Sequence, residues 1–406
     1  WYAKSSGTTN DKSKFLPVTP EILKGCHYKG GFDTVSIYLQ NNPDSHFFAS
    51  KGLILGGSHS PSPLNRNAHC GDLSAVLLQN LNPLVNLIRV PDKKIILMDE
   101  WESKIKAIVE STWKTDVNSL SGVPSWMLVL IKAVLQKTGS EYLTDVWPNM
   151  EVFFHGGISF EPYRDQYKAL IPSDRMHYME TYNASEGFFG LQDNPEEHSL
   201  LLMIDYSVFY EFIPINEVGE EHPTVLPLEA VEVGKNYAMV ITTSGGLWRY
   251  QIGDTVRFTS LYPHKFVISG RTKNFINAFG EELMVDNADK AISRVCRQTG
   301  AKVKEYTAAP LFMLDKAKGR HQWMIEFEKM PPSLDDFASL LDKTLQQLNS
   351  DYEAKRYKEI SLQPLEIQVA REGTFYEWLR RKGKLGGQHK IPRLSNDRTF
   401  IEELEK

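Results

Sequence analysis

The sequence predicts an α/β fold, with a large N-terminal α/β domain followed by a smaller α+β domain. Between about residues 51 and 270, short runs rich in β-branched and aromatic residues recur, bounded by Gly, Pro, Asn and Asp as strands are. Several runs are apolar at consecutive positions, which is typical of strands buried on both faces under flanking helices. Beyond Gly270 the pattern changes to a smaller set of mixed helices and strands.

The N-terminal elements follow from apolar runs and helix end signals. The clearest strands are expected at 51–55, 151–154, 200–204, 209–213 and 237–241. Helices are expected at 71–81, 99–113, 124–137 and 162–169. The helix at 124–137 has the strongest end signals, because Pro124 stands at its first position and Gly139 follows its end.

The C-terminal elements are predicted in the same way. A helix is expected at 285–297, strands at 303–306 and 322–327, a helix ending near 349, a strand at 365–369 and a helix at 374–382. Ser333 and Asp336 indicate a capping box at the start of the helix that ends near 349. A domain boundary near Arg271 divides the chain into residues 1–270 and 271–406.

Composition limits the class of protein. The 406 residues, 41% of them apolar, suffice for two or three domains, and a net charge of −5 gives no basic field for nucleic acid or an anionic membrane. No apolar run reaches the length of a membrane span. The three cysteines are far apart and form no C-x-x-C pair, which argues against a disulfide framework or a structural zinc site and favours a reducing cytoplasm. Because the chain begins at Trp1, we expect the native start to lie upstream.

The opening segment, residues 4–14, has the composition of a phosphate-binding loop. Hydroxyl side chains surround one glycine, in the order Ser5, Ser6, Gly7, Thr8 and Thr9, with three lysines nearby. Backbone N–H groups and hydroxyls of such a turn can converge on phosphate oxygens, although the Walker spacing is absent. The alternative is an exposed polar turn.

Two further segments carry candidate nucleotide ligands. In residues 181–187, expected to follow a strand at 177–180, Tyr182 is suited to cover a base and Glu186 to hold Mg²⁺. The alternative is a turn with a solvated glutamate. Asp254 follows Gly253 at a predicted turn, where its carboxylate can accept hydrogen bonds from two ribose hydroxyls. An ordinary Gly-Asp turn explains it equally well.

Two basic segments are candidates for conformational roles. Gly270 and Arg271 stand at the predicted boundary, where a turn would permit domain rotation and place a guanidinium beside a nucleotide. The alternative is a charged linker. Residues 384–393 form a basic, glycine-flanked segment that could carry Lys390 into a cleft, or could be a mobile solvated tail.

In this order the motifs resemble one family. They are Ser5-Ser6-Gly7-Thr8-Thr9, Tyr182-x-Ala184-Ser185-Glu186, Tyr250-x-Ile252-Gly253-Asp254, Gly270-Arg271 with Ile276-Asn277 and Gly280-Glu281, and Gln388-x-Lys390-x-Pro392-Arg393. Together they resemble the auxin-responsive Gretchen Hagen acyl acid amido synthetases, members of the adenylate-forming superfamily of acyl-CoA synthetases and luciferases. The resemblance covers essentially the whole chain. Departures are Asn10-Asp11 in place of further loop glycines, and Asn183 within the tyrosine motif.

The resemblance implies a large adenylate-forming domain and a small mobile domain with ATP between them. By motif, Ser5, Ser6, Thr8 and Thr9 would grip the β- and γ-phosphates around Gly7, Tyr182 with Ala184 and Ser185 would contact adenine, Glu186 would hold Mg²⁺, and Asp254 would bind the ribose. Gly156-Gly157 resembles the glycine pair whose backbone approaches adenine and the acyl group, Arg271 the hinge arginine, and Lys390 the lysine near the α-phosphate.

The implied reaction is ATP-dependent adenylation of a carboxylic acid, followed by transfer of the acyl group to an amine, expected to be that of an amino acid. The expected partners are these small molecules, with no nucleic acid or membrane. An acyl pocket is expected to include Val123, Trp126 and Met127, for which core packing is the alternative. Two other functions stay open: an acyl- or aryl-CoA ligase with the same first step, and a catalytically inactive nucleotide-binding regulator.

Overall fold

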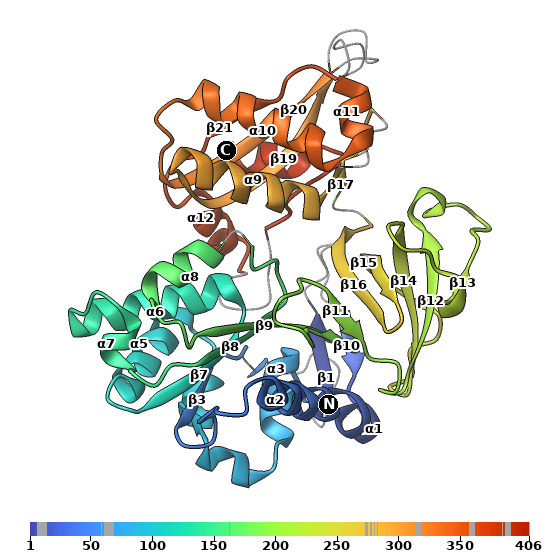
Figure 1. The fold of residues 1–406 in the computed structure, drawn as a ribbon. Helices are drawn as coiled ribbons and strands as arrows, with labels where there is room; N and C mark the ends of the chain where they lie inside the picture. The colour runs from blue at the N-terminus through green and yellow to red at the C-terminus, as the bar shows by residue number, and fades with distance from the viewer. Residues whose placement is uncertain are drawn as a thin grey trace.

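The computed structural model describes residues 1–5, 14–57, 59–60, 69–161, 163–272, 275–276, 278–279, 281, 283–312, 319–356, 362–383, 385 and 391–405. Its elements form two lobes (Figure 1). The large lobe is residues 1–271 and contains the long sheet. The small lobe, residues 275–405, contains a separate sheet with its own helices.

The long sheet is mixed, with twelve strands among the described residues. One half is parallel and runs in the order β6 (Arg89–Val90), β3 (Lys51–Ile54), β7 (Val117–Gly122), β8 (Val152–Gly156) and β9 (His177–Ala184). The other half is antiparallel and continues as β10 (Gly187–Leu191), β11 (Leu200–Leu202), β16 (His264–Arg271), β15 (Tyr250–Leu261), β14 (Asn236–Thr243), β12 (Val208–Pro214) and β13 (Leu226–Pro227). All five strands predicted in this part of the chain are present.

The parallel half separates two hydrophobic cores, as the consecutive apolar residues of its strands predict. Val152 and Phe153 of β8 point to opposite faces and belong to different cores. The core of Phe153 lies under helices α5 (Trp101–Thr112), α6 (Pro124–Thr138), α7 (Leu143–Val146) and α8 (Arg164–Leu170). Helix α6 ends where predicted, because Gly139 adopts a left-handed conformation with φ of 72°.

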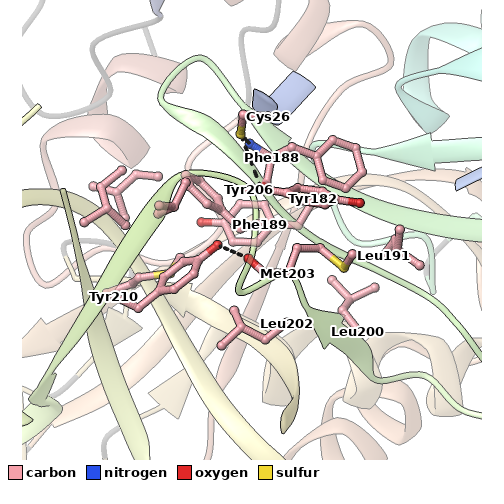
Figure 2. Packing of buried hydrophobic residues seen from close by; sticks show 14 of the residues in the cluster. Cys26, Tyr182, Phe188, Phe189, Leu191, Leu200, Leu202, Met203, Tyr206 and Tyr210 are labelled. Carbon is pink, nitrogen blue, oxygen red and sulfur yellow. Dashed lines mark hydrogen bonds between the residues drawn. The ribbon is translucent and has the colours of Figure 1, made fainter. Parts of the chain in front are cut away.

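The second core lies against α1 (Pro20–Ile22), the π-helical turn η1 (Leu23–Tyr28), α2 (Lys29–Asn41) and α3 (Leu73–Asn80). Figure 2 shows Cys26 of η1 against the backbone of Phe188, and the hydroxyl of Tyr210 donating a hydrogen bond to the carbonyl of Met203. The other helical segments of the large lobe are η2 (Pro83–Leu87), α4 (Lys93–Ile96), η3 (Ile215–Glu217) and η4 (Leu228–Ala230).

The chain begins in a smaller sheet at the edge of the second core. Strand β1 (Tyr2–Ser5) pairs with β2 (Lys14–Pro17) and with β5 (Cys70–Gly71), which pairs with β4 (His59–Ser60). The first residues therefore form a strand that ends at the start of the predicted phosphate loop. Residues 6–13 of that loop lie outside the described residues.

The small lobe is an α+β unit. Strands β19 (Lys302–Phe312), β20 (Gly319–Lys329) and β21 (Glu366–Val369) form its sheet, and α9 (Val285–Thr299) and α10 (Leu334–Leu348) share its core. Ser333 caps α10 by accepting a hydrogen bond from the backbone N–H of Asp336 at 3.2 Å, as the capping signal predicts. The remaining elements are β17 (Phe275–Ile276), β18 (Leu283–Met284), α11 (Ser350–Arg356), α12 (Thr374–Arg381) and α13 (Thr399–Leu404).

The predicted fold class is therefore confirmed. The division at residues 270 and 271 falls at the last residue of β16 and remains a prediction. Among the described helices, none combines the length and the hydropathy needed to cross a bilayer. No disulfide joins the cysteines Cys26, Cys70 and Cys296.

Candidate active site

Asp254 lies at the centre of a polar cluster built from three strands. Its Oδ1 accepts a hydrogen bond from Nε of Arg271 at 2.6 Å, and its Oδ2 accepts one from the hydroxyl of Tyr182 at 2.5 Å. Asp254 on β15 and Arg271 on β16 are paired in the strand register, while Tyr182 comes from β9. The fold thus unites three residues that the sequence motifs placed in one site.

The local backbone differs from the sequence expectation. Asp254 does not lie in a turn: it belongs to strand β15, which begins at Tyr250. Gly253 before it has φ of 86°, and the register with β16 shifts just beyond it, between Thr255 and Val256. A left-handed residue inside a strand changes the direction of the side chain that follows it. Glycine stands at this position because other residues rarely adopt the left-handed conformation. Gly253 thus has the backbone conformation of a turn glycine, but it lies within strand β15 and not in the predicted turn.

The charges of the cluster are set by burial and by pairing. Burial lowers the pKa of Arg271, but the adjacent carboxylate of Asp254 outweighs it, and the net pKa is raised. Burial and the charge of Asp254 hold the pKa of Tyr182 well above its ordinary value, so its phenol stays protonated. Each carboxylate oxygen has two acceptor positions, so Asp254 can still accept hydrogen bonds from a ligand.

Tyr182 is held rigidly. Its ring packs at 5.0 Å from that of Phe189 and 6.1 Å from that of Phe266, both in edge-to-face geometry, and only 6% of the residue is exposed. Strand β9 extends through this motif to Ala184, four residues beyond the strand end predicted at residue 180. Ala184 is half-buried and Ser185 is buried at the turn that follows.

Glu186 stands in that turn, beside the Asp254 cluster. Burial, followed by the nearby charge of Asp254, raises the pKa of Glu186 to about 7. A divalent cation would favour its ionised form. No set of three or more His, Cys, Asp or Glu residues with metal-binding geometry occurs among the described residues. Mg²⁺ commonly uses one or two carboxylates together with substrate phosphates, so Glu186 fits such an ion.

The glycine pair closes the site on the β8 side. Gly156 pairs with Thr181 in the strand register, so it lies next to Tyr182. A Cβ atom on Gly156 would lie 2.2 Å from the carbonyl oxygen of Thr181, and Gly157 has φ of 84°. Both positions therefore require glycine, and they leave backbone uncovered at the carboxyl end of β8.

Several predicted residues lie outside the described part of the chain. These are Ser6, Gly7, Thr8, Thr9 and Lys390; the backbone of Ser5 ends β1. Lys14, at the far end of the loop, donates a hydrogen bond to the hydroxyl of Tyr250 at 3.0 Å. Its positive charge also partly offsets the rise in the pKa of Glu186, so the end of the loop lies near the cluster.

The three predicted acyl-pocket residues have different surroundings. Val123 approaches the glycine pair, since its Cγ2 would lie 3.5 Å from a Cβ on Gly157. Met127 has no exposed surface and packs in the core under α6. Trp126 packs at 4.7 Å from Trp101 and also against the apolar cluster of α12 and α13 in the small lobe. Only Val123 therefore borders the candidate site.

The sequence reasoning missed the contacts that join the lobes. Tyr163 in the large lobe meets Glu305 and Arg393 of the small lobe. The expectation of a mobile basic tail is wrong for the residues around Arg393, because its carbonyl accepts a hydrogen bond from Ala308 at 2.9 Å and Leu394 is fully buried. The apolar Leu394 was the sequence feature that could have indicated a packed segment here instead of a mobile tail.

Comparison with known proteins agrees with this architecture. Three family models match the chain in order: the GH3 family N-terminal domain at residues 1–176, the GH3 family central domain at 201–271 and the GH3 family C-terminal domain at 286–399. The chain is 27% identical to the indole-3-acetic acid-amido synthetase GH3.4 of Arabidopsis thaliana, over 97% of this chain and 68% of that protein. It is 26% identical to the 4-substituted benzoates-glutamate ligase GH3.12 of Arabidopsis thaliana, over 76% of this chain and 59% of that protein.

The fold has solved counterparts. The GH3.15 acyl acid amido synthetase superposes with a TM-score of 0.77 at 18% identity, covering all of this chain and 80% of that chain. A 2-hydroxyisobutyryl-CoA ligase superposes with a TM-score of 0.58 at 11% identity, covering all of this chain and 76% of that one. The matched region spans between 46% and 68% of the first curated relatives. The three consecutive family domains, found on a fold shared with the GH3.15 acyl acid amido synthetase, show that the chain belongs to the GH3 family.

Proposed function

We propose that this protein adenylates a carboxylic acid with ATP and then transfers the acyl group to the amine of an amino acid. The observation that carries the proposal is the meeting of Tyr182, Asp254 and Arg271, with Glu186 beside them. This cluster lies where the carboxyl end of β9 meets β15 and β16, a typical position for a nucleotide site in an α/β fold. Membership of the GH3 family and relatives named as amido synthetases support the second step.

The described residues suit distinct parts of ATP. Asp254 would accept hydrogen bonds from the ribose hydroxyls, with Nε of Arg271 holding its carboxylate in place at 2.6 Å. Tyr182 would meet adenine with its small exposed edge, opposite the uncovered backbone of Gly156 and Gly157. The predicted phosphate loop from Ser5 to Thr9 would bind the β- and γ-phosphates.

Charge neutralisation would come from three sources. Glu186 would hold Mg²⁺, which would supply positive charge to the phosphate oxygens when bound. Lys390 would act near the α-phosphate, and Lys14 adds positive charge close to Glu186. Such fixed charges stabilise phosphoryl and nucleotidyl transfer chiefly by orientation and electrostatics.

The proposed reaction has two displacements. In the first, a carboxylate oxygen of the substrate attacks the α-phosphorus of ATP, and the bond to pyrophosphate breaks. In the second, the neutral amine nitrogen attacks the carbonyl carbon of the acyl-adenylate, AMP leaves, and the nitrogen releases a proton. We propose that the small lobe rotates about Arg271 between the two steps.

An acyl-CoA or aryl-CoA ligase is the second candidate function. It is favoured by the fold similarity to a 2-hydroxyisobutyryl-CoA ligase, and it would use a thiol in the second step. An inactive nucleotide-binding regulator is the third. The cluster of Asp254, Arg271 and Tyr182 argues against loss of activity, because hydrogen bonds hold its three side chains together at one carboxylate.

One screen tests these candidates. Pyrophosphate release is measured with ATP, Mg²⁺ and a panel of carboxylic acids, and each active acid is incubated again with amino acids or with coenzyme A. We expect pyrophosphate with some acids, and an amide product by mass spectrometry only with amino acids. A thioester in place of the amide would support the ligase, and no pyrophosphate with any acid would support the regulator.

We also propose that the protein acts in the cytoplasm, where its three cysteines stay reduced.

A further inference from the structure

The loop that follows Gly157 joins the candidate nucleotide site to the small lobe. It begins at the end of β8, beside Tyr182, and leads within six residues to Tyr163 at the start of α8. Tyr163 is only 4% exposed, and its hydroxyl reaches Glu305 of the small lobe. The same short segment therefore borders both the site and the interface.

Tyr163 is inserted into an ion pair of the small lobe. Its hydroxyl donates a hydrogen bond to Oε1 of Glu305 at 2.9 Å and accepts one from Nη2 of Arg393 at 3.2 Å. Nη1 of Arg393 also donates to Oε2 of Glu305 at 2.6 Å, so the guanidinium grips the carboxylate with both nitrogens. The side chains of Arg393 and Glu305 are 15% and 19% exposed. One phenol of the large lobe thus completes a largely buried charge pair of the other.

Arg393 also fixes the segment in which it lies. Its carbonyl accepts a hydrogen bond from the N–H of Ala308, and the carbonyl of Pro392 accepts one from Oγ1 of Thr307 at 2.7 Å. The guanidinium carbon lies 4.5 Å above the ring of Tyr306. These contacts tie residues 392–395 to β19. In the sequence, Lys390 precedes Arg393 by three residues.

A second contact reinforces the first on the same loop. Oε1 of Glu161 pairs with Nη1 of Arg297 at 3.2 Å, while its Oε2 pairs with Arg164 of its own lobe at 3.1 Å. Ser293, one turn before Arg297 on α9, also donates a hydrogen bond to Glu161 at 3.4 Å. The loop therefore holds the small lobe at β19 and at α9.

We propose that Tyr163 is a positioning residue: by completing the Arg393–Glu305 pair, it locks the small lobe in the described orientation and so sets where residues 392–395 lie relative to the glycine pair. This inference rests on the proposed function for its link to the reaction, but the lock itself does not. Loss of this hydroxyl would remove the hydrogen bonds that tie the large lobe to this ion pair and leave the pair itself intact, so that the small lobe could adopt further orientations.

The lock is tested first without any reaction. Spin labels are attached at Glu141→Cys in the large lobe and Lys302→Cys in the small lobe, both exposed positions, and mass spectrometry confirms that each molecule carries two labels. We expect one narrow distance distribution in the parent protein and a broader or second distribution in Tyr163→Phe. Tyr167→Phe is the matched control, because it removes a buried hydroxyl that bonds to Pro124 within the large lobe at 2.7 Å. Identical distributions for Tyr163→Phe and its parent would overturn the proposal.

The second test separates the two half-reactions. ATP–pyrophosphate exchange reports adenylation, and single-turnover reaction of preformed acyl-adenylate with the amino acid reports transfer. We expect Tyr163→Phe to change the ratio of the two rates by about tenfold, the effect of losing one hydrogen bond to a charged group. Tyr167→Phe should change both rates by the same factor. Equal changes in Tyr163→Phe would overturn the link to the reaction. If the parent protein lacks both activities, the proposed function fails while the distance measurement still decides the lock.

Discussion

At the scale of single residues, the motifs predicted Asp254, Tyr182 and Arg271 as residues of one site but not the hydrogen bonds between them. Tyr182 and Arg271 are 72 and 17 positions away from Asp254 in the chain, and the arrangement of β9, β15 and β16 in the long sheet brings them to one carboxylate. Local sequence carries the chemical type of a residue, whereas contacts between distant strands depend on the whole fold. For the same reason, the contact between Tyr163 and Arg393 was not predictable from the sequence.

The metal assignment predicts the effect of removing one carboxylate. Glu186→Ala should lower ATP–pyrophosphate exchange by about a hundredfold or more, because the phosphate charge would lose a fixed cation in a partly buried site. Glu196→Ala, which removes an exposed carboxylate ten residues along the chain, should leave the rate unchanged. Exchange at the parental rate in Glu186→Ala, measured at saturating Mg²⁺, would contradict the assignment.

The buried carboxyl of Asp289 predicts how stability depends on pH. It accepts a hydrogen bond from Tyr306 at 2.5 Å, and burial raises its pKa from 3.8 to about 6, although the nearby charge of Arg393 acts in the opposite direction. Below pH 3.8 both folded and unfolded chains hold this proton. As pH rises from 3.8 to the folded pKa of about 6, the unfolded chain releases the proton while the folded protein keeps it, which lowers the free energy of unfolding by about 3 kcal/mol in total.

Asp289→Asn should remove this dependence while its amide oxygen still accepts from Tyr306. Chemical denaturation at pH 4 and pH 7 measures it: relative to the parent, the variant should gain about 2 kcal/mol between the two pH values. Asp335→Asn, on the exposed side of α10, is the control. Parallel pH profiles for the parent and Asp289→Asn would show that the carboxyl is not perturbed.

At the scale of elements, apolar periodicity predicted the buried strands and helices well and the polar strand ends poorly. Strand β9 continues through Thr181 and Asn183, although polar residues of this kind are typical of turns. The structure keeps them extended because β10 pairs with this part of β9. Strand β15 was missed for a similar reason, because Gly253 within it predicted a turn. Both errors fall at the candidate site, where polar residues and glycines replace the regular pattern.

The glycine pair at the end of β8 allows a test at this scale. Gly156→Ala should destabilise the protein by about 2 kcal/mol or more, because the new Cβ would meet the backbone of Thr181 and force β8 from β9. Gly31→Ala should instead stabilise it by about 0.5–1 kcal/mol, since Gly31 lies within α2 with nothing within 4 Å of its Cβ position. Denaturant midpoints measure both, and a stabilised Gly156→Ala would contradict the proposed close packing of the two strands.

At the scale of the whole molecule, the two-lobe organisation was predictable because the pattern of predicted helices and strands changes near Gly270. The interface between the lobes was not, since it consists of single residues drawn from many elements. Besides Tyr163, Lys132 pairs with Glu328 at 3.1 Å and Arg257 with Asp286 at 3.1 Å across it. Such partly exposed pairs contribute little individually, so apolar contacts should carry more of the interface energy.

Trp126 is an apolar residue of α6 for which two roles can be tested, in the acyl pocket or in the contact between the lobes. As an acyl-pocket residue it would control the KM for the acid; as a contact residue it would control stability, because its ring packs against Trp101 and against the cluster of Phe375 and Trp378 in the small lobe. The structure favours the second. Trp126→Ala should therefore lower the free energy of unfolding by about 3 kcal/mol, with the KM for an active acid changed less than about twofold. Trp248→Ala, which removes a ring that is 82% exposed, should change stability by less than about 0.5 kcal/mol. A large rise in KM at parental stability would instead place Trp126 in the acyl pocket.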